Sequence, residues 1–517
     1  MRRLFVAACA CLAICAGEAR ASELPADDKL DAALQARARA ARSFVAPTAS
    51  SRVIVRSADG RSLSHLIDAV HGVTGRVFPW MGGQVALVPN DAIEWLASQP
   101  EVASISLDRA VRGTLQRTAT GTGARWVVDR LGLDGAGVGV ATIDSGIASH
   151  ADLEGRVAHF VDFVNGQAQP YDDYGHGTHV AGIISGSGHD SNGVRKGMAP
   201  GAHLVVLKAL DARGKGFTSN VIAAIDYAIA NREPFNIRVI NLSVAAGVYE
   251  SYSRDPLTLA ARRAVEAGII VVAAAGNNGR GAAGDPLYGG IASPGNAPWV
   301  LTIGASNEMG TAVREDDVVA AFSSRGPTAI DKAAKPDLVA PGVGIESTTE
   351  PSSTLFAANP GSRLWGAIGT DSEPYLRLTG TSMSAPVVAG AIALMLQANP
   401  ALTPNAVKAI LQYTAESRDG DDSYTQGGGF LNARGAVELA RAFASGATAL
   451  EAGQDPVRWS RHIVWGARRI GGMLLPQSNA WQLGVTWGAS ETPDGAPVEI
   501  ALECGDGCSG APAGVRR

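Results

Sequence analysis

The chain has 517 residues, which at roughly 150 residues per domain allows about two to four domains and a large hydrophobic core. Apolar residues make up 46% and charged residues 18%, and 62 residues are glycine, a composition that excludes a disordered or collagen-like protein. The 44 basic and 49 acidic residues give a net charge of −5 without a block of like charge, so no nucleic acid is expected as a partner.

The N-terminal residues have the pattern of an export signal. Two arginines precede an apolar run over residues 4–15. Residues 19–21 (Ala-Arg-Ala) then place small alanines at the two positions that a signal-peptide cleavage site requires to be small. Because this run is too short to span a bilayer and no later segment reaches about 20 apolar residues, we expect a signal peptide at 1–21 and no transmembrane segment in the mature chain. The sequence therefore predicts a secreted protein, extracellular or periplasmic. A membrane anchor is the alternative.

Removal of the signal peptide leaves two of the five cysteines, Cys504 and Cys508. In an oxidising compartment a pair this close in sequence is expected to form one small disulfide loop. A zinc site would need more ligands than this pair offers.

The next segments differ in composition and pattern. Residues 22–50 are rich in Ala, Arg and Asp without a sustained apolar stripe, which predicts a mobile leader. Residues 51–110 are predicted to form a small α+β, ferredoxin-like domain in the order βαββαβ. Its strands are expected at 52–56, near Val77, at 83–88 and at 102–107, and its helices at 62–72 and 90–99. The Arg-, Gly- and Thr-rich residues 111–125 are predicted to be an exposed linker.

Residues 126–445 alternate apolar strands with amphipathic helices, which predicts an α/β domain with a doubly wound, mostly parallel sheet and flanking helices. Strands are expected at 137–143, 203–209, 238–244, 269–275 and 300–304, and helices at 218–231, 257–267, 384–397, 403–414 and 432–443. Ligands of such a sheet bind beyond the carboxyl ends of its strands. Residues 446–517, with four of the nine tryptophans, are predicted to be a small strand-rich extension.

Acyl transfer by a hydroxyl group needs a base, a carboxylate that orients the base, and donors for the oxyanion. Asp144 closes a predicted strand, although a lone Asp in such a place is more often a turn residue or a helix cap. His176 stands between two glycines at the start of a small, apolar run that can form a buried helix. A metal site with His179 is the alternative, but a zinc protease would need the pattern His-Glu-x-x-His.

Ser382 precedes an apolar helix, which it could simply cap. Gly380 before it permits the close approach of a substrate backbone, and Pro386 suits the first turn of a helix, where a missing N–H costs little. The N–H of Ser382 would then point outward at the positive end of the helix and could bind an oxyanion. The side chain of Asn277 or Asn278, after another buried strand, could supply the second donor, although Asn before Gly is usually a turn former.

With these motifs the chain resembles the subtilisin-like serine proteases, the subtilases, over about residues 125–445. The matching motifs, in the family's order, are Asp-Ser-Gly at 144–146, His-Gly-Thr-His-Val-Ala-Gly at 176–182, Ala-Gly-Asn-Asn-Gly at 275–279 and Gly-Thr-Ser-Met-Ser-Ala-Pro at 380–386. The resemblance implies that Ser382 is the nucleophile, His176 its general base and then acid, and Asp144 the carboxylate that orients the imidazole. It implies that Asn277 is the side-chain oxyanion donor and that the chemistry requires no cofactor.

The resemblance also implies that the substrate binds as an extended strand between two edge segments. These segments match Ser243-Val244-Ala245 and Gly214-Lys215-Gly216, while Ala274, Ala275 and Gly276 would wall the pocket for the residue before the scissile bond, with Ala292 near its floor. Small uncharged walls favour a large apolar or aromatic side chain. The first segment departs from the family's common Ser-Leu-Gly-Gly, which leaves the side-chain preference open.

Residues 51–110 resemble the family's inhibitory propeptide, so the chain's own propeptide is expected to act as an intramolecular inhibitor, with residues 111–125 as the maturation segment. A permanent accessory domain is the alternative. A structural Ca²⁺ is also expected, with Asp152 and Asn192 as ligands.

The sequence as a whole predicts a monomeric, secreted serine endopeptidase that acts on proteins or peptides and is made as a self-processing precursor. One alternative is a catalytically inert binding or scaffold protein of the same fold, against which the four intact residues argue. The other is an esterase with the same triad, against which the two strand-binding segments argue.

Overall fold

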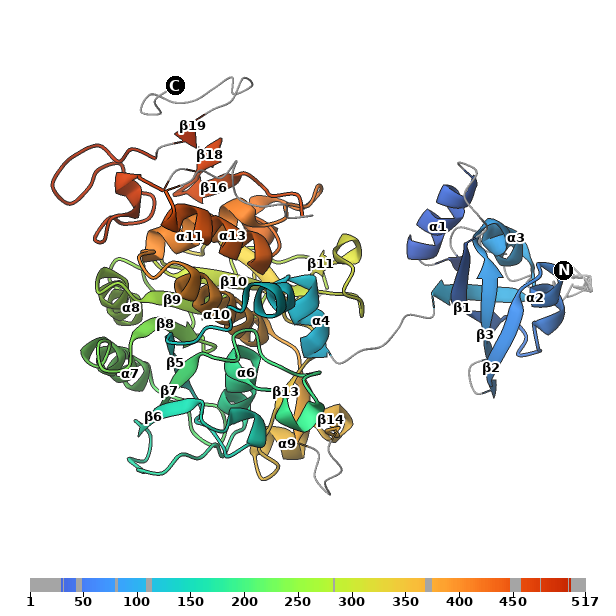
Figure 1. Cartoon of the computed structure of the whole chain (residues 1–517), viewed down its shortest axis with the longest axis horizontal. Coiled ribbons are helices and arrows are strands. Elements are labelled where there is room, and N and C mark those ends of the chain that lie inside the picture. The colour runs from blue at the N-terminus through green and yellow to red at the C-terminus, as the bar shows by residue number, and fades with distance from the viewer. Residues whose placement is uncertain are drawn as a thin grey trace, which may run out of the picture. The chain divides into compact units, whose positions relative to one another are not determined.

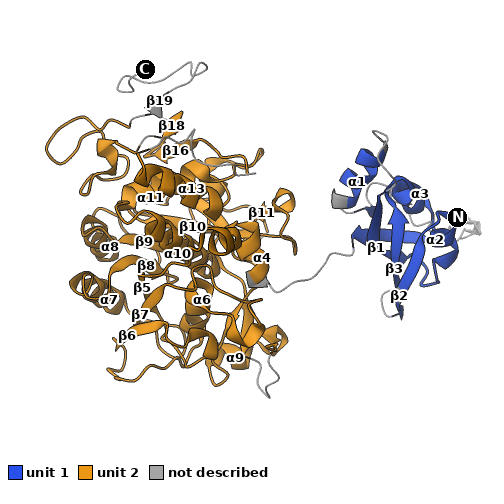
Figure 2. Cartoon of the chain, in the orientation of Figure 1, with its two compact units in different colours: residues 1–110 blue, residues 111–517 orange. Residues whose placement is uncertain are grey.

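The computed structural model describes residues 29–30, 32–42, 49–79, 82–107, 114–281, 284–367, 374–446, 457–474, 476–500 and 502–503. The chain divides into two compact units, residues 1–110 and residues 111–517 (Figure 2). The predicted signal peptide and the predicted pair Cys504 and Cys508 lie outside the described residues.

Unit 1 contains an antiparallel sheet with the strand order β2-β3-β1-β4. Its elements follow the βαββαβ order that the sequence pattern predicts: β1 (Ser50–Ser57), α2 (Ser64–Ala69), β2 (Val73–Phe78), β3 (Gly83–Pro89), α3 (Ile93–Ser98) and β4 (Val102–Leu107). The short 3₁₀ helix Asn90–Ala92 leads into α3.

The prediction of a mobile leader is wrong for residues 32–42, which form helix α1 (Ala32–Arg42). Leu34 and Ala38 of α1 are buried in the core of unit 1 together with Leu30. Leu34 and Ala38 stand four residues apart, which places them on one face of the helix, while Leu30 lies before the helix in a β-bridge with Ile105. The stripe escapes sequence reasoning because alanines and arginines fill the positions between.

Unit 2 is built on an eight-stranded sheet with the order β11-β10-β9-β8-β5-β7-β6 and with β12 beside β10. All of these pairs are parallel except β10 with β11, which confirms the predicted α/β class. The strands are β5 (Gly139–Asp144), β6 (Val157–Asp162), β7 (His203–Lys208), β8 (Ile237–Leu242), β9 (Ile270–Ala274), β10 (Leu301–Asn307), β11 (Val318–Val319) and β12 (Leu338–Pro341).

Helices cover both faces of this sheet because side chains alternate between the faces along each strand. In β8, Val239 belongs to the core cluster that contains α6 and α10, whereas Ile240 belongs to the cluster that contains α7 and α8. The helices are α6 (His176–Ser185), α7 (Thr218–Ala230), α8 (Pro256–Glu266), α10 (Thr381–Ala398), α11 (Pro404–Thr414) and α13 (Ala433–Ala444) (Figure 1).

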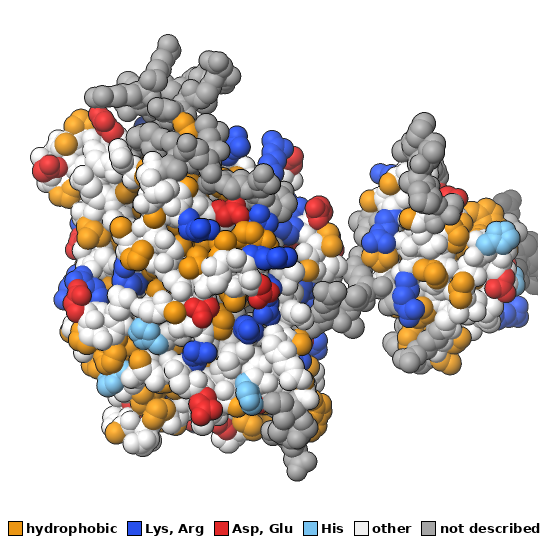
Figure 3. Space-filling view, viewed as in Figure 1, with side chains coloured by type: hydrophobic (Ala, Val, Ile, Leu, Met, Phe, Trp, Pro, Cys, Tyr) orange, Lys and Arg blue, Asp and Glu red, His pale blue; other side chains and the backbone are white. Residues whose placement is uncertain are grey.

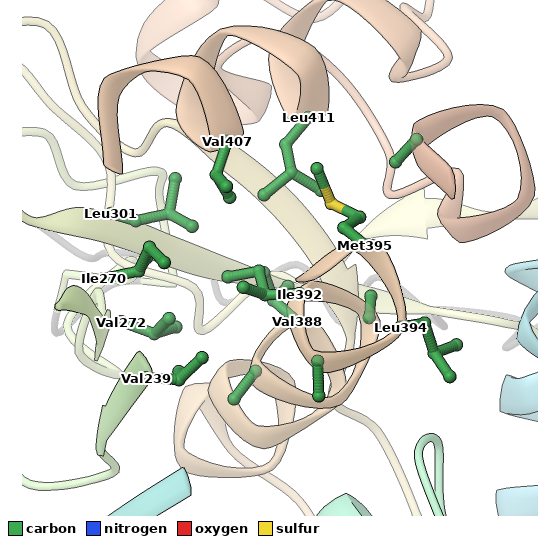
Figure 4. Packing of buried hydrophobic residues seen from close by; sticks show 14 of the residues in the cluster. Val239, Ile270, Val272, Leu301, Val388, Ile392, Leu394, Met395, Val407 and Leu411 are labelled. Atoms are coloured by element: carbon green, nitrogen blue, oxygen red, sulfur yellow. The ribbon is translucent and has the colours of Figure 1, made fainter. Parts of the chain in front are cut away.

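Helix α10 is the centre of the larger core cluster. Its Val388 and Ile392 lie beside Val239 and Val272 of the sheet, and its Met395 lies beside Leu411 of α11 (Figure 4). Among the described helices it alone is long and apolar enough to cross a membrane, yet 83% of its apolar window is buried inside the protein. It is therefore a core helix, apolar on all sides because protein surrounds it.

Smaller elements complete unit 2: α4 (Thr114–Gly121), α5 (Ala124–Trp126), β13 (Ile345–Thr348), α9 (Thr354–Ala358), β14 (Arg363–Leu364), β15 (Tyr375–Leu378), α12 (Ser423–Gln426), β16 (His462–Trp465), β17 (Arg468–Gly471), β18 (Met473–Leu474) and β19 (Leu502–Glu503). Lys, Arg, Asp and Glu side chains are interspersed on the face of unit 2 seen in Figure 3. This mixture agrees with the absence of a charge block in the sequence.

The prediction of an exposed linker is wrong for the part of residues 111–125 that forms α4. Thr118 and Ala119 are buried, and the Thr118 hydroxyl donates a 2.7 Å hydrogen bond to the carboxylate of Glu308. Small Thr, Ala and Gly side chains are typical of loops, but they also permit the close packing seen for this helix.

The C-terminal extension shares the core of the sheet domain. Trp465, Trp481 and Trp487 are buried in the same cluster as α11, and the Asn405 amide donates 2.9 Å hydrogen bonds to two carbonyl oxygens of the extension, those of Ala480 and Val485. Its tryptophans therefore cover α11 instead of forming a separate core.

Candidate active site

Asp144 is the last residue of β5, so its carboxylate lies at the carboxyl end of an inner strand. The residue is only 1% exposed. Its Oδ1 accepts a 2.7 Å hydrogen bond from the N–H of Ser145, whereas its buried Oδ2 has no partner among the described residues. The backbone directly after β5 thus helps to fix the orientation of the carboxylate.

His176 is the first residue of α6, and the glycine that follows it explains how this helix reaches β5. A Cβ atom on Gly177 would lie 2.2 Å from the carbonyl oxygen of Gly146, two residues after Asp144. Any larger residue at position 177 would push the two segments apart. Glycine at this position is therefore a requirement of the close approach between His176 and Asp144.

The Nδ1 atom of His176 lies 2.8 Å from Oδ1 of Asp144. Since the carboxylate accepts, Nδ1 carries the proton and the lone pair of Nε2 is left for a proton donor. Burial by itself lowers the pKa of His176, but the charge and the hydrogen bond of Asp144, with the charge of Asp172, outweigh burial and raise this pKa above its ordinary value.

Asp172 fixes the loop that leads to His176. One carboxylate oxygen accepts hydrogen bonds from the N–H of Gly175 and the hydroxyl of Ser145, and the other accepts two from Thr178. This buried carboxylate therefore joins the end of β5 to the start of α6. No sequence argument identified it, although it stands four residues before His176.

Ser382 is the second residue of α10 and is partly exposed. Its Oγ donates a 3.0 Å hydrogen bond to the carbonyl oxygen of Ser243, and the Ser243 hydroxyl donates one of 2.8 Å to the carbonyl oxygen of Ser382. This reciprocal pair ties the start of α10 to the end of β8. His176 and Ser382 line the same cleft. In enzymes without substrate, catalytic hydrogen bonds are often long or not yet formed.

The amide of Asn277 is oriented by Thr381. Its Oδ1 accepts 3.0 Å hydrogen bonds from the N–H and from the hydroxyl of Thr381, which leaves Nδ2 as the end of the amide that can donate elsewhere. The N–H of Ser382 belongs to the first turn of α10, where N–H groups have no partner within the helix. Asn278 is held differently, since its backbone N–H donates to Ser324.

Both predicted edge segments line the cleft of about 520 Å³ that contains His176 and Ser382. It includes Gly214, Lys215 and Gly216 from one segment and Ser243, Val244 and Ala245 from the other. Sequence reasoning missed the apolar part of this cleft, which is formed by Tyr174, Leu210, Phe217, Val221 and Leu257. Phe217 directly follows the segment 214–216 and is 77% exposed. An aromatic residue in a predicted loop is a sequence feature that could have identified it as part of the cleft.

A second cleft of about 460 Å³ lies on the other side of Ser243 and Ser382, both of which it shares with the first. Ala274, Gly276, Asn277 and Ala292 line it, as the predicted pocket requires. Ala275 does not line it and is fully buried. The expectation for Ala275 is wrong because successive side chains of an extended segment point to opposite sides.

His179, one turn after His176, is fully buried. Its Nε2 lies 3.1 Å from the carbonyl oxygen of Ile345 and 3.0 Å from that of Leu376, so it donates to both. Burial, with the nearby His176, lowers the pKa of His179 to about 3 and keeps the ring neutral. Among the described residues, the two histidines belong to no group of three possible metal ligands, so the structure gives no support to the alternative zinc site.

The surroundings of Asp152, one of the two predicted calcium ligands, do not fit a calcium ion. Asp152 lies in a group with His150 and Asp190. Its Oδ1 accepts from the N–H of Asp190 (2.8 Å) and its Oδ2 from the hydroxyl of Tyr375 (2.9 Å). Ca²⁺ takes six to eight oxygen ligands, whereas this group offers an imidazole and carboxylate oxygens already bound by the protein.

The positively charged side chain of Arg195 lies against Tyr375, the residue that donates to Asp152. The guanidinium of Arg195 lies 4.6 Å from the centre of the Tyr375 ring and pairs with Glu346 at 2.8 Å. The residues at Asp152 therefore form an internal hydrogen-bond network that does not fit a calcium ion, and the assignment of Asn192 stays a prediction.

Comparisons with known proteins agree with this geometry. The model of the subtilase family matches residues 135–436. The serine protease AprX of Bacillus subtilis (strain 168) is 39% identical over 358 residues, which cover 68% of this chain and 78% of that protein. Subtilisin E of the same organism is 32% identical over 371 residues, which cover 71% of this chain and 84% of that protein.

Among solved structures, a cold-adapted subtilisin-like serine proteinase is 29% identical, with a TM-score of 0.44, over 58% of this chain and 90% of its own. The family match spans more than half of the chain and includes all four motifs. The chain therefore belongs to the subtilase family and is a subtilisin-like serine peptidase.

Proposed function

We propose that this protein is a secreted serine endopeptidase that is made as a self-processing precursor. One observation carries the proposal: His176 and Asp144 share a 2.8 Å hydrogen bond at the edge of a cleft that Ser382 also lines. The N-terminal sequence pattern supports export, and peptide bonds are the substrate that the two edge segments suit best.

In the proposed reaction, Oγ of Ser382 attacks the carbonyl carbon of the scissile bond while Nε2 of His176 takes its proton. The charge of Asp144 stabilises the imidazolium that forms. The oxyanion accepts hydrogen bonds from Nδ2 of Asn277 and from the N–H of Ser382. When the C–N bond breaks, His176 returns the proton to the leaving amine, and water then releases the acyl group by the same steps.

The substrate would lie as a strand between residues 214–216 and residues 243–245. The second cleft would accept the side chain before the scissile bond. Its Ala and Gly walls carry no charge, so we propose a preference for large apolar or aromatic side chains at this position.

Unit 1 is proposed to be the inhibitory propeptide. Since α4 is buried in unit 2, the cut that releases unit 1 is proposed to lie before Thr114 instead of anywhere within residues 111–125. The enzyme itself would make this cut.

The test is to express the Ser382→Ala precursor in a host without other active proteases, with Ser384→Ala as the matched control. Ser384 is fully buried, and its hydroxyl has no partner among the described residues. We expect the Ser382→Ala protein to retain unit 1 and the Ser384→Ala protein to lose it. Normal maturation of Ser382→Ala would contradict self-processing.

A second experiment, with the mature wild-type enzyme, separates the peptidase from the esterase alternative. Mature enzyme is incubated with an unfolded protein and, in parallel, with a simple ester. We expect the unfolded protein to be cut at internal bonds after large apolar residues. Ester turnover without any peptide cleavage would support the alternative.

A further inference from the structure

Lys208 is a buried cation that the proposed reaction does not use. It is the last residue of β7, has an exposed fraction of 0%, and lies directly beside Asp144 in the register of β5 and β7. A buried ammonium group is costly unless hydrogen bonds and a counter-charge compensate it. Its acceptors therefore show what the charge is used for.

Each of the three N–H donors of Lys208 has an acceptor. Nζ lies 2.5 Å from the carbonyl oxygen of Ser145, 2.7 Å from Oδ1 of Asp173 and 2.9 Å from the carbonyl oxygen of Leu210. It also lies 4.6 Å from the centre of the Tyr171 ring, a cation–π distance.

These acceptors belong to three different segments of the active site. Ser145 directly follows Asp144, Asp173 stands three residues before His176, and Leu210 opens the segment that leads to the substrate edge at 214–216. From this convergence we propose that Lys208 is a positioning residue. Its ammonium group holds the end of β5, the loop before His176 and the segment that leads to the substrate edge at 214–216 in their catalytic arrangement. This inference rests on the proposed function.

The substrate edge at 214–216 is also held by hydrogen bonds that do not involve Lys208. We therefore expect it to stay largely ordered when Lys208 is replaced. The carboxylate of Asp211 accepts hydrogen bonds from the N–H groups of Arg213 and Lys215, and the N–H of Gly214 donates to the carbonyl of Asp211. The turn before the edge is thus closed by its own bonds. Loss of Lys208 should therefore affect the alignment of Asp144 and His176, and hence kcat, more than KM.

Unit 2 offers a matched control in Lys408, which is 3% exposed and also binds two carbonyl oxygens and one aspartate. Its acceptors, Pro298, Val300 and Asp337, line neither of the two clefts. Replacing either lysine by methionine removes a buried charge of the same kind, but only Lys208→Met removes it from the active-site segments.

The experiment measures kcat and KM of wild type, Lys208→Met and Lys408→Met, with active sites counted by a serine-directed phosphonate. We expect Lys208→Met to lower kcat per titrated site by about 10- to 100-fold, since displacements near 1 Å have this effect, with KM changed by less than about threefold. Lys408→Met should lower the melting temperature but keep the wild-type kcat per site. Equal kcat values for the three proteins would overturn the inference.

A second variant keeps the inference testable if Lys208→Met does not fold. Asp173→Asn retains Lys208 and removes only its partly exposed counter-charge. A smaller fall in kcat per site is expected, and an unchanged kcat would overturn the inference. Failure of the proposed function gives a different result, because wild type itself would then be neither labelled by the phosphonate nor active.

Discussion

Lys208 and Lys408 are both buried ammonium groups bound by two carbonyl oxygens and one aspartate, yet their surroundings differ. The counter-charge of Lys208, Asp173, keeps 34% of its side chain exposed, whereas Asp337 beside Lys408 keeps 4%. Asp337 serves two lysines, since Nζ of Lys335 lies 2.7 Å from its other oxygen. Lys408 also lies 4.8 Å from the ring centre of Trp487 in the C-terminal extension.

The difference separates two uses of the same buried chemistry. The cluster around Lys208 joins loops that carry reactive groups and reaches the solvent. The cluster of Lys335, Asp337 and Lys408 is sealed between β12, α11 and the extension. We therefore expect changes in the first cluster to alter kcat and changes in the second to alter the free energy of unfolding.

Asp337→Asn should produce the largest effect on stability. It leaves the ammonium groups of Lys335 and Lys408 buried without a counter-charge, and breaking a buried pair in this way costs about 3–5 kcal/mol. Burial and the nearby Lys408, opposed by Asp337, lower the pKa of Lys335 to about 7, so proton loss from Lys335 offsets part of this cost. Urea unfolding of the mature protein at pH 6, where Lys335 is charged in the wild type, measures the change. A loss of kcat per titrated site without destabilisation would contradict the division between the clusters.

Asn277→Ala should produce the largest effect on catalysis without a comparable effect on stability. Removal of one oxyanion donor lowers kcat by about 10²–10³-fold and leaves KM nearly unchanged, because the bond forms only in the transition state. Asn278→Ala is the control, since the side chain of Asn278 is not oriented by Thr381. If Asn278→Ala shows the larger fall, the oxyanion donor has been assigned to the wrong residue.

The pH dependence of kcat/KM tests the electrostatics of the catalytic side. His176 acts as a base only when neutral, and its pKa is raised because Asp144 and Asp172 outweigh burial. Tyr171, Asp173, Tyr174, His179 and Lys208 are further titratable groups of the adjoining segments. Activity should therefore disappear, as pH falls, at a value above the roughly 6.5 of an ordinary histidine.

Samples returned from each pH to pH 8 before assay distinguish titration from unfolding. An acidic limb centred below about pH 6.5 would show that the two carboxylates do not outweigh burial.

Calcium removal should have the smallest effect. Because the oxygens of Asp152 are bound by Asp190 and Tyr375, a chelator is expected to leave the melting temperature within about 1 °C of the untreated value, which in a unit of this size is a change of no more than about 1 kcal/mol. A fall of several degrees that added Ca²⁺ reverses would contradict the fit argument.

The sequence predicted the sheet domain well because its strands are buried on both faces and appear as continuous apolar runs. Strands β5, β7, β8, β9 and β10 lie where these runs predict them. The pattern missed β6, whose residues are mostly half-buried, and α1, whose stripe is masked by alanine. It also took α4 for a linker, because small residues that pack closely resemble those of a loop.

The site was predictable where a residue stands at the end of an element, as Asp144, His176 and Ser382 do. Asp172 and Lys208 escaped because Ser145, to which both are hydrogen-bonded, is near them only in space. Ala275 was wrongly included because adjacency in a motif does not determine where a side chain points. Spatial convergence of this kind requires coordinates.

We propose above all that Ser382 is a nucleophile activated by His176 and Asp144. The most direct test is to remove unit 1 with an added protease, to label the remaining protein with a serine-directed phosphonate, and to map the modified peptide by mass spectrometry. We expect one adduct, on Ser382, whose formation stops in His176→Ala prepared in the same way, while both proteins remain folded. An adduct on another serine, or an active enzyme that the reagent does not label at Ser382, would contradict it.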